Sequence, residues 1–403
     1  MNSKAEYFKN KLPDYWFEDV DTPNGKLPYL DAKIRSIPKG KSFIFLTDPH
    51  CGNPAEDKNR MHSPAIIGYI RAMTGIDKVV LGGDYINSDK TKEEAVRNIN
   101  YYMDVMSEPC DDGMIVVPGN HDLNNPHPHD DFLVRTVSQS DLEKSLMRYV
   151  KNAVCEDVSD KISYIDCTEE EYNDLLSHSR LHYYIDDDTA KIRYIILNTG
   201  CPRIGNPVFK YFGVSVSPEL ILQFDWLYET LMSVPEGYDV VIGAHRLIQN
   251  PLTKLENYML EMFKIVSAYR TRSKVTVKNV FSDNELVAKY YSAGEHEYDL
   301  TKAKGSGNVV IVSADRHTDK QETADYDENG CFVSTPYDGN SVSPTGLVIN
   351  ITQTDAYKGV GKAGYEMVVD TVSEQCFDIV TLQHDGNVTL TRIGAGYDRF
   401  IKA

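Results

Sequence analysis

Five short clusters of Asp, His and Asn each follow an apolar run in this 403-residue chain. They are Asp48-Pro49-His50, Gly83-Asp84, Gly119-Asn120-His121-Asp122, Gly243-Ala244-His245 and Ala314-Asp315-Arg316-His317. Imidazoles, carboxylates and an amide oxygen are ligands that Mn, Fe, Zn and similar cations accept. Two such ions, roughly 3.5 to 4 Å apart, can clamp a phosphoryl group and convert water to hydroxide. The residue types therefore predict a metal centre suited to phosphoester chemistry.

The apolar runs that precede these clusters predict the elements that must position them. The runs cover residues 42–47, 78–81, 114–118, 239–242 and 309–313. Short, continuous apolar runs are typical of strands buried on both faces. Ligands of open α/β sheets bind outside the carboxyl ends of the strands, so we expect the five clusters to converge. Asp84 follows two glycines that allow close backbone approach, which makes it the candidate for a bridging carboxylate.

Helical patterns lie between the predicted strands. They run from Ser63 to Thr74, from Lys92 to Met106, and from Pro218 to Met232 with Ser217 as N-cap. Strands that alternate with helices in this way predict the α/β class.

The chain divides into three predicted regions. Residues 1–40 are expected to form a lead-in segment on the surface, and residues 41–330 the core. Two insertions in that core, at about 123–190 and 250–304, are long enough to predict a helical cap over the site. They carry helical patterns at 140–154, 169–179 and 255–269. In residues 331–403, alternating patterns at 365–370, 377–382 and 387–392 predict C-terminal β strands packed on the core.

The charge of the chain restricts its partners. The formal net charge is −18, whereas tight binding of a polyanion requires a concentrated basic surface. Long duplex nucleic acid is therefore not expected. Two metal dications could still make one acidic pocket locally positive, so small phosphorylated substrates remain open. Oligomeric state cannot be read from the sequence.

Cysteine content and hydropathy bear on the compartment. Seven cysteines without a CxxC pair predict neither a disulfide framework nor a thiolate zinc site. The first residues lack the apolar segment of a secretory signal, and no run of about 18 apolar residues occurs. We therefore expect a cytoplasmic protein that does not enter a membrane.

The five motifs, in this order and spacing, resemble the calcineurin-like metallophosphoesterases, whose pattern is DxH, GDxx, GNHD/E, a lone His and GHxH. The resemblance spans about residues 42–320. It implies a four-layer α/β/β/α sandwich and a hydrolase that cleaves phosphoester bonds with two metals and a bridging hydroxide. By resemblance, Asp48, His50 and His317 bind the first metal, Asp84 bridges, and Asn120, His245 and Asp315 bind the second. His121 then lies near the leaving oxygen, where it acts as the general acid or holds the phosphoryl oxygens, with Asp122 orienting its imidazole.

The chain departs from the family pattern at Asp315, where a carboxylate replaces an imidazole. A harder oxygen donor favours Mn or Mg over Zn at the second site. The expected cofactors are thus two divalent ions, Mn, Fe or Zn, with Mg also possible.

Two other functions compete with a hydrolase of a small phosphodiester or phosphomonoester, of which the diester is slightly favoured. A non-catalytic binding or scaffold member of the fold is supported only by Asp315. A nuclease acting on nucleic-acid ends needs a basic groove lined by aromatic residues. Residues 254–278 are the one modestly basic stretch with interleaved Tyr and Phe. A helix face exposed to solvent is a simpler explanation of this pattern than a groove for nucleic acid.

Overall fold

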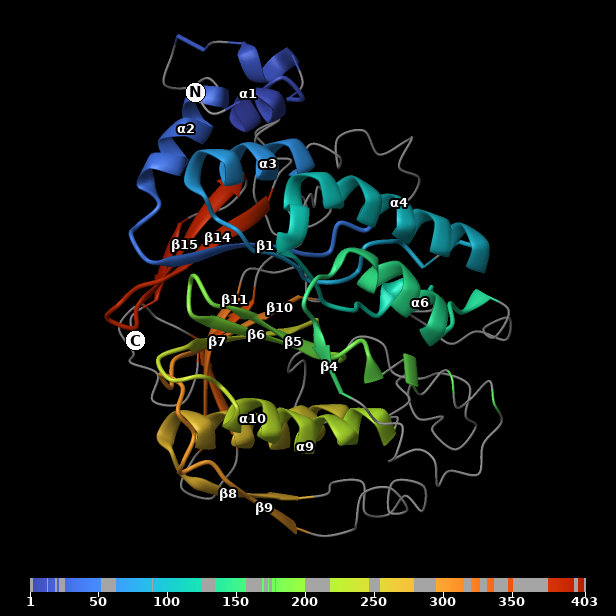
Figure 1. Cartoon of the computed structure of the whole chain (residues 1–403), viewed down its shortest axis with the longest axis vertical. Coiled ribbons are helices and arrows are strands. Elements are labelled where there is room, and N and C mark those ends of the chain that lie inside the picture. The colour runs from blue at the N-terminus through green and yellow to red at the C-terminus, as the bar shows by residue number, and fades with distance from the viewer. Residues whose placement is uncertain are drawn as a thin grey trace.

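Four layers make up the computed structural model of this chain (Figure 1). Two sheets lie face to face; helices α3 and α4 cover the outer face of one, and α9 and α10 cover that of the other. The described residues are 3–12, 14–18, 20–21, 26–51, 63–88, 90–124, 135–156, 169, 173, 176–177, 179–199, 218–245, 254–278, 295–314, 320–326, 332–336, 347–350, 376–394 and 398–401. The predicted α/β/β/α sandwich is confirmed.

The first sheet contains six strands among the described residues, in the order β16-β15-β14-β1-β2-β3. Their bounds are β1 Lys41–Leu46, β2 Val79–Leu81, β3 Met114–Val116, β14 Cys376–Leu382, β15 Val388–Gly394 and β16 Arg399–Ile401. Strands β1, β2 and β3 are parallel, with Ile44 opposite Val79 and Val79 opposite Met114. Their carboxyl ends, which precede three of the five motifs, therefore lie at one edge of the sheet.

The second sheet has the order β12-β11-β13-β10-β7-β6-β5-β4 within the described part of the chain. The bounds are β4 Val154–Cys155, β5 Tyr183–Asp187, β6 Ile192–Leu197, β7 Asp239–Ala244, β10 Val309–Ser313, β11 Lys320–Tyr326, β12 Phe332–Pro336 and β13 Leu347–Asn350. Strands β6, β7, β10 and β13 are parallel, with Ile242 opposite Ile311. A separate ribbon pairs β8 (Lys274–Lys278) with β9 (Glu295–Asp299).

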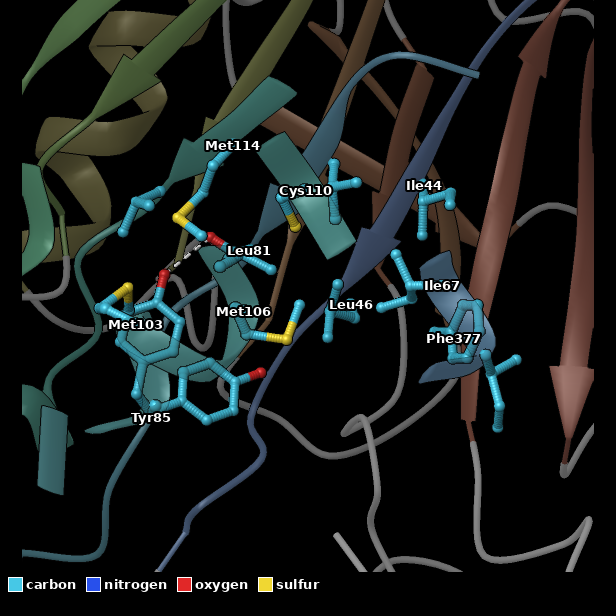
Figure 2. Packing of buried hydrophobic residues seen from close by; sticks show 14 of the residues in the cluster. Ile44, Leu46, Ile67, Leu81, Tyr85, Met103, Met106, Cys110, Met114 and Phe377 are labelled. Carbon is cyan, nitrogen blue, oxygen red and sulfur yellow. Dashed lines mark hydrogen bonds between the residues drawn. The ribbon is translucent and has the colours of Figure 1, made fainter. Parts of the chain in front are cut away.

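Continuous apolar runs form these strands because both faces of each sheet are covered. Phe43, Phe45 and Val80 point into the layer between the sheets, where they meet Tyr194 and Val241 of the second sheet. The alternate side chains of the same strands pack beneath the helices (Figure 2). Among them, Figure 2 labels Ile44, Leu46, Leu81 and Met114, beside Met103, Met106 and Cys110 of α4.

Helices α3, α4, α9 and α10 match their predicted positions closely. The helix bounds are α3 Ser63–Thr74, α4 Lys92–Cys110, α6 Gln139–Leu146, α9 Pro218–Met232 and α10 Lys254–Thr271, with the 3₁₀ helices η3 Asp111–Gly113, η4 His121–Leu123 and η5 Met147–Tyr149. Helix α4 begins with a capping box. The Thr91 side chain accepts a hydrogen bond from the backbone N–H of Glu94, and the Glu94 side chain accepts one from the backbone N–H of Thr91. None of the helices within the described ranges is both long and apolar enough to cross a bilayer.

The N-terminal segment contributes to the core. It contains α1 (Ser3–Lys9), the 3₁₀ helix η1 (Asp14–Phe17) and α2 (Lys26–Ser36). Phe8 and Trp16 are almost fully buried in the cluster that includes α3. A Cβ on Gly68 of α3 would come within 2.4 Å of the Phe8 ring, so the glycine creates the space that Phe8 fills.

Parts of both predicted insertions form structural layers. Strands β4 and β5 of the first insertion extend the second sheet, and the predicted helix at 140–154 ends at Leu146. In the second insertion, α10 packs beneath the second sheet, where Ile265 and Tyr269 join the cluster of Val240 and Ile311. Residues 125–134, 157–168, 250–253 and 279–294 of the insertions lie outside the described residues, as do most of the predicted helix at 169–179 and the predicted strand at 365–370.

The C-terminal strands are integral to the first sheet. Strand β14 pairs antiparallel with β1 and also with β15, so the predicted hairpin is hydrogen-bonded to the central strands.

One side chain joins the two sheets at an edge strand. The hydroxyl of Tyr183, on β5, donates to the carbonyl oxygen of Val116 at 2.9 Å and accepts from the Val116 N–H at 2.8 Å. Strand β3 is the edge of the first sheet, so this hydroxyl satisfies two backbone groups that lack a strand partner.

We predict that Tyr183→Phe lowers the free energy of unfolding by about 2 kcal/mol or more, because it leaves a buried N–H and a buried C=O unpaired. Tyr194→Phe is the matched control, since the Tyr194 hydroxyl is buried and has no hydrogen-bond partner among the described residues. Its removal should change stability by less than about 0.5 kcal/mol. Urea unfolding of both variants beside the parent measures the difference, and equal losses would contradict this role for Tyr183.

Candidate metal centre

Four of the five motifs converge where the two sheets meet. The loops that follow β1 and β2 are joined by backbone hydrogen bonds: the N–H of Asp48 donates to the Gly83 carbonyl, and that of His50 donates to the Asp84 carbonyl, both at 3.0 Å. His245 directly follows β7 of the second sheet. The predicted convergence of Asp48, Asp84 and His245 is thus present in the structure.

The loop backbones adopt unusual conformations. Asp48, His50 and Asp84 have φ angles of 53°, 44° and 55°, in the left-handed region that non-glycine residues seldom adopt. Such conformations cost of order 1–3 kcal/mol each and cluster at functional sites. Here they turn three potential ligands toward one point.

Asp84 lies at the centre of this group. Its Oδ2 is 3.1 Å from Nε2 of His245, 3.7 Å from Nε2 of His50 and 4.0 Å from Nε2 of His121. Its Oδ1 accepts the backbone N–H of His121 at 2.7 Å. Two groups of potential ligand atoms, each within 4.8 Å, share this carboxylate: His50, Asp84 and His121, and Asp48, Asp84 and His245. A shared carboxylate is what a bridging ligand requires.

The histidines stabilise the ionised form of Asp84. Burial by itself raises the pKa of this carboxyl, but His245, His121 and His50 together hold the pKa well below its usual range. Asp122 behaves oppositely. Burial and the charge of Asp84 raise the pKa of Asp122 to about 8, against the effect of its backbone hydrogen bonds. Two buried carboxyls that repel each other separate in this way, so that one stays ionised while the pKa of the other rises.

His245 is oriented as a ligand. Its Nδ1 lies 2.7 Å from the carbonyl oxygen of Gly82, which can only accept, so Nδ1 carries the proton. The lone pair of Nε2 then points toward Asp84. A backbone carbonyl that fixes the tautomer in this way is the usual second contact of a metal-binding histidine.

Asn120 also fits a metal site. The residue is 8% exposed, and no described residue donates a hydrogen bond to its buried Oδ1. Buried amide oxygens are normally satisfied, and a cation is one partner that satisfies them.

Asp122 makes contacts that differ from the expected ones. Its carboxylate accepts three backbone N–H groups, those of Asp84 at 3.1 Å, Tyr85 at 2.7 Å and Gly119 at 2.8 Å. The expectation that Asp122 orients the His121 ring was wrong in this respect, because both of its oxygens bind the loop backbones. Ser88 takes that place, with its Oγ 2.7 Å from Nδ1 of His121. Nothing in the sequence signalled Ser88, since it lies outside the five motifs.

Asp315 and His317 lie outside the described residues. The residue before them is placed, however: the N–H of Ala314 donates to the His245 carbonyl at 2.9 Å. Strand β10 is also parallel to β7. The last motif therefore begins next to His245.

Two glycines allow the loops to approach this closely. Gly83 has a φ of 99°, and a Cβ there would lie 2.7 Å from Nδ1 of His245 and 2.9 Å from Cα of Gly119. A Cβ on Gly119 would lie 2.0 Å from the backbone nitrogen of Asp84. Neither position can hold a side chain without moving a ligand.

We predict that Gly83→Ala weakens the binding of divalent metal by about tenfold or more, because the new methyl group displaces His245. Gly75→Ala is the matched control. Gly75 has a similar φ of 75°, but a Cβ there would meet no atom within 4 Å. The Gly75→Ala variant should be less stable by about 1 kcal/mol but should bind metal as tightly as the parent. Calorimetric titration with Mn²⁺ compares the two, and unchanged affinity in Gly83→Ala would refute the steric argument.

Comparison with known proteins identifies the family of this chain. The family model described as calcineurin-like phosphoesterase matches residues 41–249. Among solved structures, the chain is similar to a dimetal phosphatase from Danio rerio, with 12% identity, a TM-score of 0.45, and coverage of 90% of this chain and 99% of that one. No curated protein matches. The chain belongs to the calcineurin-like phosphoesterase family and is a metal-dependent hydrolase of phosphoric esters.

Proposed function

We propose that the chain hydrolyses a small phosphoester, with a diester favoured over a monoester, at a centre of two divalent ions. The proposed ligands are Asp48, His50 and His317 for the first ion, Asn120, His245 and Asp315 for the second, and Asp84 for both. The observation that carries the proposal is the sharing of the buried Asp84 carboxylate by two groups of potential ligands.

The assignment of ligands to the two ions combines resemblance and distance. Oδ1 of Asp48 lies 3.8 Å from Nε2 of His50, which supports placing both on one ion. Asp48 also falls within the group of Asp84 and His245, so it stands between the two proposed positions. When bound, the ions supply positive charge that stabilises phosphoryl oxygens and lowers the pKa of water.

The protein's own residues hold fixed positions around the phosphoryl group. Asp84 and His245 are almost fully buried and are held by backbone hydrogen bonds, so they need little rearrangement during the reaction. The His121 side chain is 28% exposed, whereas those of His50 and His245 are 5% and 0% exposed. Of these three described histidines, His121 is the one that can meet substrate, and we assign it proton donation to the leaving alcohol.

The metal is proposed from the ligand chemistry. Three carboxylates and one amide oxygen stand beside three imidazoles in the proposed set. Oxygen donors favour harder cations, so we propose Mn²⁺, with Fe, Zn and Mg as alternatives for the experiment to separate.

The net charge and the cysteines of the chain bear on the size of the substrate and on the compartment of the protein. The net charge of −18 opposes binding of long nucleic acid and supports a small substrate. A cytoplasmic location is part of the proposal. It is supported by Cys110 and Cys155, which are free thiols, as is usual in a reducing compartment.

The test is hydrolysis of bis-p-nitrophenyl phosphate and p-nitrophenyl phosphate by metal-stripped protein that is then supplied with Mn, Zn, Fe or Mg. We expect the highest turnover with Mn and the diester. Asp84→Asn should lower kcat by at least about a hundredfold, as expected for a group that acts at the reacting atoms. Asp112→Asn, an exposed substitution in η3, is the control and should match the parent.

If neither ester is hydrolysed, the number of metal ions bound per chain shows which part of the proposal fails. Folded protein that binds two metals but hydrolyses neither ester would refute the proposed substrate class. Protein that binds no metal would refute the ligand assignment.

A further inference from the structure

Ser88 contacts His121 although it belongs to none of the five motifs. Its Oγ lies 2.7 Å from Nδ1 of His121 and 3.2 Å from the carbonyl oxygen of the same residue. We propose that Ser88 is a positioning residue that fixes both the plane of the His121 ring and the proton on its Nδ1. This inference rests on the proposed function, in which His121 protonates the leaving group.

The two contacts determine where the protons lie. The carbonyl oxygen of His121 can only accept, so the single proton of the Ser88 hydroxyl is donated to it. The hydroxyl oxygen then accepts from Nδ1, and Nδ1 must carry a proton. Both contacts are satisfied together only in this arrangement. The other ring nitrogen, Nε2, is left to exchange protons with the substrate.

The opposite side of the ring is also constrained. Nε2 of His121 lies 4.0 Å from Oδ2 of Asp84, and the His50 ring meets the His121 ring edge to face, with 4.6 Å between centroids and an interplanar angle of 87°. The backbone N–H of His121 is held by Asp84. With Ser88 at Nδ1, the imidazole is fixed on both sides and its Nε2 faces the centre.

Ser88 is itself held by a network of hydrogen bonds. Arg135 donates to the Ser88 carbonyl at 3.0 Å. The Asn124 side chain bonds both backbone groups of Lys90, accepting from its N–H at 3.3 Å and donating to its carbonyl at 2.7 Å. Asn124 also donates to the Arg135 carbonyl at 2.9 Å. The loop that carries Ser88 is therefore tied to the segment that follows His121.

This arrangement suits proton donation. In the step, Nε2–H of the imidazolium breaks, its proton passes to the oxygen of the departing alcohol, and the ring becomes neutral. The neutral ring retains its proton on Nδ1, which is the tautomer that Ser88 accepts. Ser88 thus stabilises the form of His121 that the reaction produces, without itself touching the substrate.

The activity test uses leaving groups of different basicity. A phenyl ester has a poorer leaving group than a p-nitrophenyl ester, so it depends more on proton donation. For Ser88→Ala we expect kcat to fall by about tenfold or more on the phenyl ester and by less than about threefold on the p-nitrophenyl ester. KM and metal content should equal those of the parent, and Ser88→Thr, which keeps the hydroxyl, should restore the phenyl ester rate.

Ser107→Ala is the matched control, because the Ser107 hydroxyl donates to the Asp104 carbonyl within α4 and is not among the described contacts of the metal centre. It should leave both rates unchanged. Equal loss on both esters in Ser88→Ala, or loss of metal, would overturn the positioning role.

A spectroscopic measurement tests Ser88 independently of turnover. With ¹⁵N-labelled histidine, the parent should show the Nδ1–H tautomer for His121, identified by the signal missing from His121→Gln. Ser88→Ala should shift that signal toward the Nε2–H tautomer. An unchanged His121 tautomer in Ser88→Ala would overturn the inference, even if the esters are hydrolysed. If the parent protein hydrolyses neither ester, the proposed substrate class is refuted. The tautomer measurement then decides on the role of Ser88 by itself.

Discussion

The burial of the Asp84 carboxylate is the constraint on which the rest of the site depends. An ionised carboxylate away from water is costly unless positive charge and hydrogen-bond donors surround it. Here the donor is the backbone N–H of His121, and three imidazoles lie within 4.0 Å of Oδ2. The strand ends, the glycines and the left-handed residues all serve to bring those groups to one carboxylate.

That carboxylate also fixes how the two sheets sit against each other. At the carboxyl ends of the strands, Asp84 of the first sheet lies 3.1 Å from His245 of the second. At the amino ends, Lys41, the first residue of β1, pairs with Asp239, the first residue of β7, at 2.7 Å. Asp239 further accepts from Asn308. With polar contacts at both ends and an apolar layer between, sliding of one sheet over the other would break one end or expose apolar surface.

The strands that precede the motifs were predictable because their signal is local. Residues 309–312 are all apolar and are followed by Ser313, a pattern typical of a strand covered on both faces. The polar residues that follow such a run are then expected at the carboxyl end of the strand. The helix α10 shows the limit of this reasoning. Its pattern predicted a helix correctly, but an amphipathic pattern does not say which surface the apolar face covers. Strands β4, β5, β6, β8 and β9 were not predicted, and the two-residue β4 pairs with β5 without a periodicity that a sequence can show.

The roles of Asp122 and Ser88 depended on loop conformation and were not predictable. A carboxylate next to His121 suggested a partner for the ring, yet the turn after β3 directs Asp122 to the N–H groups of Tyr85 and Gly119. Because Asp122 holds the loops together, Nδ1 of His121 is bonded by the neutral hydroxyl of Ser88 instead. A neutral partner at Nδ1 adds no further negative charge beside Asp84. The centre thus keeps its carboxylates for the loops and the cations, and orients its exposed histidine by hydrogen bonding alone.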